Sequence, residues 1–375
     1  MKRLGILALL LTGCAAFDRT EPSALSGTIQ EYPEGTPVKG ALVRVVGTDR
    51  TIAADAFGRF KVGDLGASAS LQFWAPGHAI ATRRFRLLPG EERALDVPLP
   101  DEGETIPVSW VLFERSGRIW SVDSLGSDER CLTPELDGTQ VSPTWLAGKS
   151  QFAFIQRIPG RTQVWSRYPD GRPARYIAEL PDSAAELRWH PLGNMFVYAS
   201  TYYSPSRGMV TALRSLDFNS GVQQELVSGA AEANPAWSAD GHQLVWARRT
   251  APKPWQIWMA GPRGERPHPF AGRGSCVEPA FSPSGSQLAF ASNAAGNWDL
   301  YVAGVGTGLS EPLTDVPAGG WCRRPVWSET GDEILFESNY HPGLKKRLET
   351  PGLFAVRLST HAVRAIVTDA RAGTW

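Results

Sequence analysis

The chain has 375 residues, which is enough for two domains of ordinary size. Its 38 basic residues (Lys and Arg) balance its 38 acidic residues, so the formal net charge at pH 7 is zero. This balance singles out no class of partner, and it gives no reason to expect a nucleic acid.

The N terminus has the pattern of a signal peptide over residues 1–13. Lys2 and Arg3 precede an apolar run from Leu4 to Leu11, which is too short to span a bilayer. The run leads into Leu11-Thr12-Gly13-Cys14, which resembles the lipoprotein box of bacteria, where the cysteine is lipidated and becomes the first mature residue. An ordinary signal peptide with a chance cysteine is the alternative.

The lipoprotein resemblance implies a location. A lipid on Cys14 would hold the protein to a membrane, and residues 14–25, which are mostly small and polar, would form the anchor and tether. Ala15 stands where an aspartate is linked, in some bacteria, to inner-membrane retention. We therefore expect an outer-membrane lipoprotein that faces the periplasm or the cell surface.

Short alternating segments separated by turn residues fill the region 26–100 and predict a small antiparallel β-sandwich. The expected strands are 27–29, 41–46, 60–62, 70–73, 83–88 and 94–99. The sequences at Gly27 to Ile29, Pro37 to Val43, Asp55 to Phe60 and Pro76 to His78 together resemble the carboxypeptidase regulatory-like domain. The resemblance implies an Ig-like or transthyretin-like fold with an accessory role. Residues 98–103, rich in Pro and Gly, form a natural linker.

From residue 105 to residue 375 the chain repeats one segment. The clearest copy runs from Pro279 to Phe290, and its aromatic anchor Phe281 aligns with Trp145, Trp189, Trp237 and Trp327. Successive anchors lie 44 to 48 residues apart, and a glycine follows each by three or four residues. This period indicates a stack of like units, and the glycine indicates a tight hairpin after each anchor.

Each repeat contains four expected strands, as in the blade of a β-propeller. The pattern P-x-W-S-x-x-G-x-x-L-x-[FWY], with Asn297 to Tyr301 and Leu313 to Asp315, resembles the WD40-like repeat of TolB-type six-bladed propellers. Residues 105–138 supply a sixth blade that lacks its anchor strand, and we expect Ala370 to Trp375 to complete it and close the ring. The expected fold is all-β: a sandwich over 26–100, then a six-bladed propeller over 105–375.

Catalytic motifs are not evident. The sequence has no G-x-S-x-G, H-x-H, HExxH or C-x-x-C pattern, so we expect a binding protein with no catalytic residues, metal or cofactor. His190 and His242 are interpreted as structural or solvated. For Cys276 and Cys322, five residues before neighbouring anchors, a disulfide and free thiols both stay open, with Cys131 left free.

The connections between the second and third strands are the longest, and long loops on a rigid scaffold often carry recognition. They hold nine basic residues against one acid, Glu349, together with three tyrosines. Trp255, Trp298 and Trp321 fall outside the repeat positions and could face a ligand. The candidate binding residues are Arg157, Arg161, Tyr202, Tyr203, Arg207, Arg248, Arg249, Lys253, Trp255, Trp298, Trp321, Tyr340, Lys345, Lys346 and Arg347.

By resemblance to TolB-type propellers, the chain is interpreted as a lipid-anchored binding scaffold. Its long-loop face would recognise an envelope protein or an anionic envelope polymer. Two alternatives stay open: a sensor that binds a glycan or peptide at the channel mouth, and a propeller lyase or hydrolase.

Lipidation can be tested directly. Mass spectrometry of the mature N terminus should show an acylated Cys14, and Cys14→Ser should release the protein from membranes, because several acyl chains bind a bilayer stably. A wild-type chain that is soluble and begins at another residue would contradict this prediction.

Overall fold

The computed structural model describes residues 22–31, 36–103, 109–270, 272–342 and 345–375. The expected signal peptide and Cys14 lie outside the described residues. Within those ranges the chain is all-β, as predicted, with one short 3-10 turn at Ala147–Lys149. None of the described segments forms a helix long and apolar enough to cross a membrane.

The N-terminal domain is a sandwich of two sheets. One sheet has the order β4-β1-β7 and the other β3-β2-β5-β6. Their strands are β1 (Ser23–Glu31), β2 (Leu42–Val45), β3 (Thr51–Ala53), β4 (Arg59–Leu65), β5 (Ser68–Trp74), β6 (Ala81–Arg86) and β7 (Glu92–Leu99). Alternate residues point inward along β4, and Phe60 meets Phe73 of the facing sheet edge to face at 5.4 Å between ring centroids.

We had expected an antiparallel sandwich, but one pair of its strands is parallel. β1 and β7 pair in parallel from Ala24 with Glu92 to Glu31 with Leu99. Parallel neighbours need a long crossover connection, which here contains β4 of the same sheet and the four strands of the second sheet, β2, β3, β5 and β6. β3 was also not predicted, because its three residues are too few to show an alternating pattern.

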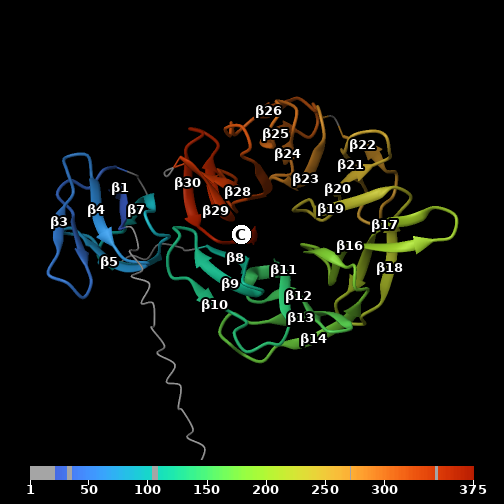
Figure 1. Ribbon diagram of the computed structural model, residues 1–375, viewed down its shortest axis with the longest axis horizontal. Coiled ribbons are helices and arrows are strands. Elements are labelled where there is room, and N and C mark those ends of the chain that lie inside the picture. The colour runs from blue at the N-terminus through green and yellow to red at the C-terminus, as the bar shows by residue number, and fades with distance from the viewer. Residues whose placement is uncertain (1–21, 32–35, 104–108, 271, 343–344) are drawn as a thin grey trace, which may run out of the picture.

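The second domain is a propeller of six four-stranded blades (Figure 1). Each blade is given from its innermost strand outward. Blade 1 is β31 (Arg371–Thr374), β8 (Trp110–Arg115), β9 (Arg118–Asp123) and β10 (Arg130–Cys131); blade 2 is β11 (Thr139–Trp145), β12 (Phe152–Ile158), β13 (Arg161–Arg167) and β14 (Arg175–Leu180); blade 3 is β15 (Ala185–Trp189), β16 (Met195–Ser204), β17 (Gly208–Asp217) and β18 (Gln223–Val227). Blade 4 is β19 (Ala231–Trp237), β20 (Leu244–Arg249), β21 (Gln256–Ala260) and β22 (His268–Pro269); blade 5 is β23 (Cys276–Phe281), β24 (Gln287–Ser292), β25 (Asp299–Gly304) and β26 (Ser310–Pro312); blade 6 is β27 (Cys322–Trp327), β28 (Glu333–His341), β29 (Lys346–Arg357) and β30 (Val363–Val367).

The second strand of each blade is buried on both faces, which confirms the double-sided apolar pattern. In β12, for example, Phe152 and Phe154 point to one side and Ala153 to the other, and all three have no exposed surface. Stacked blades cover both faces of every sheet, so the repeats share one continuous core.

The ring closes through the C-terminal strand, as predicted. β31 pairs with β8 and becomes the innermost strand of blade 1. The final residue, Trp375, is the sixth anchor: its side chain is buried, and its indole N–H donates to the carbonyl of Val326 (3.1 Å).

The sandwich lies outside the ring, beside the junction between blade 6 and blade 1 (Figure 1). Arg93 and Glu91 form an ion pair there (2.8 Å) with no exposed side-chain surface. The Arg93 guanidinium also donates to the carbonyls of Gly126 in blade 1 and Ile366 in blade 6, each at 3.3 Å. One buried arginine of the sandwich therefore holds both sides of the junction.

Glu91 is the acidic partner in this contact. Burial alone would raise its pKa, but the Arg93 charge and hydrogen bonds from His341, Arg93 and the Leu88 N–H outweigh burial and lower the pKa to about 2. Glu91 is therefore ionised at neutral pH.

One sequence interpretation needs correction, and one alternative that the sequence left open is decided. Three of the five long connections are extensions of the strands, because β16 continues to Ser204 and β17 starts at Gly208, with similar extensions in blades 2 and 6. The disulfide is absent: Cys276 and Cys322 are buried free thiols, and Cys131 is free. Burial raises the pKa of Cys322 to about 12, so this thiol stays protonated.

Truncation of the last anchor tests ring closure. Trp375→Ala should destabilise the propeller by about 3–5 kcal/mol, because it removes a buried indole and leaves a cavity. Phe57→Ala, at a side chain 64% exposed on the sandwich, is the matched control, with an expected change within about 0.5 kcal/mol. Thermal unfolding provides the measurement, and equal stability of the wild type and a variant lacking residues 370–375 would contradict the closure.

Replacement of Glu91 tests the contact between the domains. Glu91→Gln should cost about 3–5 kcal/mol at neutral pH, because it leaves the Arg93 charge buried and unpaired. The folded pKa of about 2 lies below the ordinary 4.5, so this contribution is complete above pH 4.5 and disappears as pH falls toward 2. The stability gap between wild type and variant should therefore shrink in acid.

The control is Glu92→Gln, which breaks an exposed pair with Lys61 and should change stability by less than about 1 kcal/mol. A gap between wild type and Glu91→Gln that stays constant from neutral pH to pH 3 would show that the ion pair does not fasten the domains together.

Candidate functional site

The innermost strand of every blade carries a β-bulge at the same place. Three residues before each anchor, one residue has a positive φ between 48° and 61°, although none of the six is glycine. These six residues, here called the bulge ring, are Ser142, Glu186, Asn234, Glu278, Arg324 and Ala372. Pairing with the second strand shifts register across each of them. Non-glycine residues in this conformation cost on the order of 1–3 kcal/mol each and concentrate at functional sites.

Backbone N–H groups at the bulges find acceptors on the preceding blade. The Glu186 N–H donates to Ser142 Oγ (3.2 Å) and the Asn234 N–H to Glu186 Oε2 (2.5 Å). The Arg324 N–H donates in the same way to Glu278 Oε2 (3.0 Å). In these three cases the acceptor is itself a member of the bulge ring, so the hydrogen bonds run from blade to blade around the axis.

Arg324 and Ala372 have no side-chain acceptor to offer the next blade. A glutamate on the second strand of the same blade takes that role in each case. Glu337 Oε2 accepts from the Ala372 N–H (3.1 Å), and Glu114 Oε1 accepts from the Ser142 N–H (2.6 Å). Four carboxylates therefore lie close to the propeller axis because they serve the bulges. Glu114, Glu186, Glu278 and Glu337 are here called the channel carboxylates.

The bulge ring lines a cavity of about 630 Å³. All six innermost strands contribute to its wall, so the cavity is the central channel of the propeller. Residues of the tight turns after five of these strands also line it: Lys149, Pro191, Ala239, Pro283 and Glu329. The channel therefore extends from the bulge ring to the face of the tight turns, and that end is here called the mouth.

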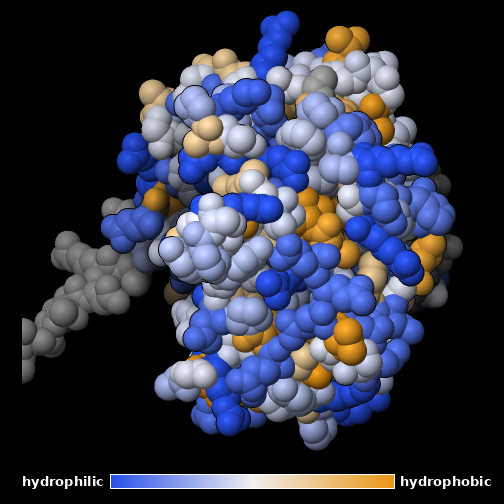
Figure 2. Space-filling view, turned by 90° about the vertical axis from the view of Figure 1, so that its right-hand side faces the viewer, coloured by the Kyte–Doolittle hydropathy of each residue, from blue (hydrophilic) through white to orange (hydrophobic). Residues whose placement is uncertain are grey.

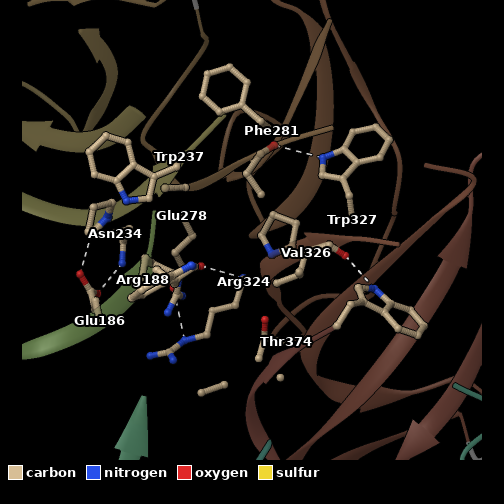
Figure 3. A pocket seen from close by; sticks show the side chains of 18 of the residues that line it. Glu186, Arg188, Asn234, Trp237, Glu278, Phe281, Arg324, Val326, Trp327 and Thr374 are labelled. Carbon is tan, nitrogen blue, oxygen red and sulfur yellow. Dashed lines mark hydrogen bonds and ion pairs between the residues drawn. The ribbon is translucent and has the colours of Figure 1, made fainter. Parts of the chain in front are cut away.

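Aromatic anchors surround the channel just inside the mouth (Figure 3). Trp189, Trp237, Phe281, Trp327 and Trp375 all line it. At the mouth, Lys149 of blade 2 and Glu329 of blade 6 form an ion pair. These two blades flank blade 1, so the pair lies beside the innermost strand of blade 1. This pair neutralises its own charges, so the net charge of the channel is decided deeper inside.

Three of the channel carboxylates line the cavity together with three guanidinium groups, those of Arg157, Arg188 and Arg324. Arg188 and Arg324 both line the cavity, and Figure 3 shows Arg188, Glu278 and Arg324 side by side. Arg324 Nε lies 3.7 Å from Glu278 Oε1 and 3.7 Å from Glu337 Oε2. The Arg324 side chain is 42% exposed, and the surface it exposes faces the channel.

Burial changes the acidity of these groups. Desolvation raises the pKa of Glu114 and of Glu278, and the nearby arginines only partly offset it. Desolvation likewise lowers the pKa of Arg188. Burial would also lower the pKa of Arg324, but Glu337, Glu278 and the other channel carboxylates outweigh it and raise that pKa. The arginines therefore do not fully offset the burial of Glu114 and Glu278.

Of the candidate binding residues from the sequence, only Arg157 lines this cavity. The second and third strands meet at the end of the propeller opposite the mouth, so most of the other candidates lie on that long-loop face. They are distributed over different blades and do not form one cluster. Eight of the nine basic residues are exposed there: Arg157, Arg161, Arg207, Arg249, Lys253, Lys345, Lys346 and Arg347.

Most of the remaining candidates make contacts within the protein. Arg248 binds the buried carboxylate of Glu232 through Nε (2.9 Å) and Nη2 (2.9 Å), so its charge is neutralised. Trp255 lies under the Arg249 guanidinium, 5.2 Å from it, and Trp298 lies under Arg323 at 4.5 Å. Trp298 also pairs with Trp321 through an isolated β-bridge. Tyr202 donates to Glu225, whereas Tyr203 is 70% exposed.

His190 has a structural role. Its ring packs edge to face against Trp237 at 4.7 Å, and Nε2 contacts the Gly241 carbonyl (2.9 Å). In the described part of the chain, no group of three or more His, Cys, Asp and Glu side chains is arranged to hold a metal ion.

Sequence reasoning missed the bulge ring, although the repeat contains a signal for it. In four of the six copies the residue after the bulge is proline: Pro143, Pro235, Pro279 and Pro325. Proline has no N–H to donate, so a proline two residues before each anchor indicates irregular pairing at that point. Alignment on that proline would have singled out the bulge position.

The outer side of the propeller offers no large apolar surface in the view of Figure 2. Most of that side is hydrophilic, and the hydrophobic residues form small separate patches. Large apolar patches are what usually mark protein contacts on an outer surface.

Comparison with known proteins supports both domains. Residues 24–100 match the family model of the carboxypeptidase regulatory-like domain. No curated protein sequence matches the chain.

Among solved structures, TolB from Acinetobacter baumannii is similar to this chain with a TM-score of 0.59 at 11% identity, covering 82% of this chain and 79% of that one. The putative TolB from Agrobacterium tumefaciens has a TM-score of 0.52 at 16% identity, covering 70% and 89%. A chain of the nidogen/laminin complex has a TM-score of 0.54 at 9% identity, covering 71% and 97%. At such identities the likeness shows the fold alone. The chain thus combines a carboxypeptidase regulatory-like sandwich with a TolB-like propeller.

Proposed function

We propose that this protein is a lipid-anchored binding scaffold of the cell envelope, and that a protein partner inserts a segment into the mouth of the propeller channel. The observation that carries the proposal is the 630 Å³ channel, which is lined by aromatic anchors and by charged groups on strained backbone. This volume lies within the range of about 300–1,000 Å³ that is usual for ligand sites. Strained residues retained in all six blades are consistent with a site, because strain of this kind concentrates where function requires it.

The architecture favours binding over catalysis as the role of the channel. The TolB-like fold is a rigid scaffold, and the anchors and bulges fix the geometry of the mouth without flexible loops. The sandwich lies beside the ring and leaves the channel uncovered in Figure 1. A chain of this shape can bind a partner in its channel while the lipid on Cys14 anchors it to the membrane.

The exposed basic residues favour the long-loop face as a second candidate surface. The eight exposed cations are accompanied by Glu349, so this face would attract an anionic protein or polymer. Exposed charges are screened within about 8 Å at physiological ionic strength, so binding there should weaken as salt rises.

Site-specific photocrosslinking in the native envelope distinguishes the two faces. A photoreactive residue would replace Ala239 or Ser284 in tight turns at the mouth, Lys253 or Lys345 on the long-loop face, and Phe57 on the sandwich; all five side chains are exposed. We expect both mouth positions to yield the same covalent adduct, because a segment that enters the channel must pass both turns.

Reversal of Arg249, Lys345 and Lys346 to glutamate is the matched control, and it should leave the mouth adduct unchanged. Adducts found only from the long-loop positions, and lost in that triple variant, would move the partner to the basic face. Adducts from Phe57 alone would move it to the sandwich.

A further inference from the structure

The hydrogen bonds of the channel carboxylates show which of them are fully engaged. Both oxygens of Glu186 accept hydrogen bonds from Asn234, at 2.5 Å each. Glu337 also accepts through one oxygen, Oε2, from the Ala372 N–H, but it is not among the residues that line the cavity. Glu186 is therefore committed to the fold, and Glu337 lies outside the cavity wall.

Glu114 and Glu278 are engaged through one oxygen only. Glu114 Oε1 accepts from the Ser142 N–H, and no hydrogen bond of the described residues reaches its second oxygen. Glu278 Oε2 accepts from the Arg324 N–H, while Oε1 has only the distant Arg324 Nε at 3.7 Å. Glu278 lines the cavity together with Glu114, so each has an acceptor atom left for a ligand.

Burial of charge supports the same two residues. Three channel carboxylates, Glu114, Glu186 and Glu278, line the cavity with the guanidinium groups of Arg157, Arg188 and Arg324, so the formal charges balance and the difference lies in burial. The arginines do not compensate the burial of Glu114 and Glu278, because the pKa of each stays raised. A further positive charge placed between them would stabilise their ionised forms.

A second observation also points to a ligand. The indole N–H groups of Trp327 and Trp375 donate to carbonyls of the neighbouring innermost strand, at 3.0 Å and 3.1 Å. The equivalent N–H of Trp189 is buried without a hydrogen-bond partner among the described residues, and so is that of Trp237, which is only 9% exposed. Figure 3 shows the Trp237 nitrogen turned into the pocket. An unpaired buried donor costs about 1–3 kcal/mol, which a ligand carbonyl would recover.

We propose that the channel binds a cationic side chain, lysine or arginine, on an extended segment of the partner, with its ammonium or guanidinium group between Glu114 and Glu278. A backbone carbonyl of the same segment accepts the hydrogen bond of the Trp237 N–H. The neighbouring anchors enclose the aliphatic part of the side chain, and arginine is favoured by the aromatic walls. This inference rests on the proposed function of the channel mouth and names what enters it.

Calorimetric titration of the full-length protein in mild detergent tests the inference with two matched probes. One is the peptide acetyl-Gly-Ser-Arg-Ser-Gly-amide, and the other replaces arginine with citrulline, which has nearly the same shape and no charge. We expect the arginine peptide to bind at least about tenfold more tightly, a difference of about 1.4 kcal/mol.

Variants locate the interaction. Glu114→Gln with Glu278→Gln should abolish the preference for arginine, while each glutamine can still accept the bulge N–H bond and keep the fold, as thermal unfolding would verify. Glu311→Gln, on the exposed outer strand β26, is the matched control and should keep the preference. Trp237→Phe should weaken both peptides alike, because it removes the N–H and leaves the charges.

The outcomes separate this inference from the proposed function. Equal binding of the two peptides, no binding of either, or an arginine preference that survives the double glutamine change would each overturn the cationic site. Crosslinking at the mouth that persists in any of these cases would leave the channel as the partner site with a different ligand chemistry. Failure of both experiments would remove the channel from consideration altogether.

Discussion

Closure of the ring between blade 6 and blade 1 is the constraint on which the channel depends. β31 has four residues and its ladder with β8 pairs only Arg371 with Glu114 and Thr374 with Leu112. So short a strand is weak closure for a chain that must bring its two ends together. Arginines reinforce the junction: Arg115 donates to the carbonyls of Asp369 (2.9 Å) and Thr368 (2.8 Å), and Arg364 to that of Ser124 (2.8 Å). Arg93 adds a bond to each side, so the sandwich takes part in holding the propeller shut.

The positive φ of the bulge residues, repeated in every blade, explains why charged side chains line the channel. A positive φ is easiest for Asn and tolerable for Ser, but Glu and Arg adopt it at greater cost. Their N–H groups find charged or hydroxyl acceptors, and charge-assisted hydrogen bonds are about twice as strong as neutral ones. The acceptors must stand near the axis to reach the bulges. The position of the channel carboxylates therefore follows from the backbone geometry. Two of these carboxylates, which the fold needs as acceptors, are also available to bind a ligand.

The sequence was sufficient for the architecture and insufficient for the site, for physical reasons. The anchor at Phe281, the glycine at Gly285 and the apolar run at Leu288 to Phe290 each act within one repeat, so a single copy predicts its own blade. The channel is made of one residue from each blade, and no local pattern tells which residues of different repeats face one another. The same limit hid the Glu91–Arg93 contact, whose partners at Gly126 and Ile366 are 33 and 273 residues from Arg93. Three of the long loops between the second and third strands were predicted wrongly for another reason. Composition alone indicated loops there, but cross-strand pairs such as Tyr203 with Met209 extend the hairpins.

The two ends of the propeller have opposite electrostatic character, and this polarity bears on how a partner could approach. Exposed cations are distributed over the long-loop face, whereas partly buried carboxylates lie inside the channel behind the mouth. The basic groups are solvated and act at long range but weakly, because salt screens them. The channel carboxylates are half-buried or buried, and a charge in such surroundings interacts more strongly over a shorter distance. A partner with separate acidic and basic segments could be attracted at one face and held at the other. The lateral position of the sandwich matters here, because a domain placed over either end would block one of the two contacts.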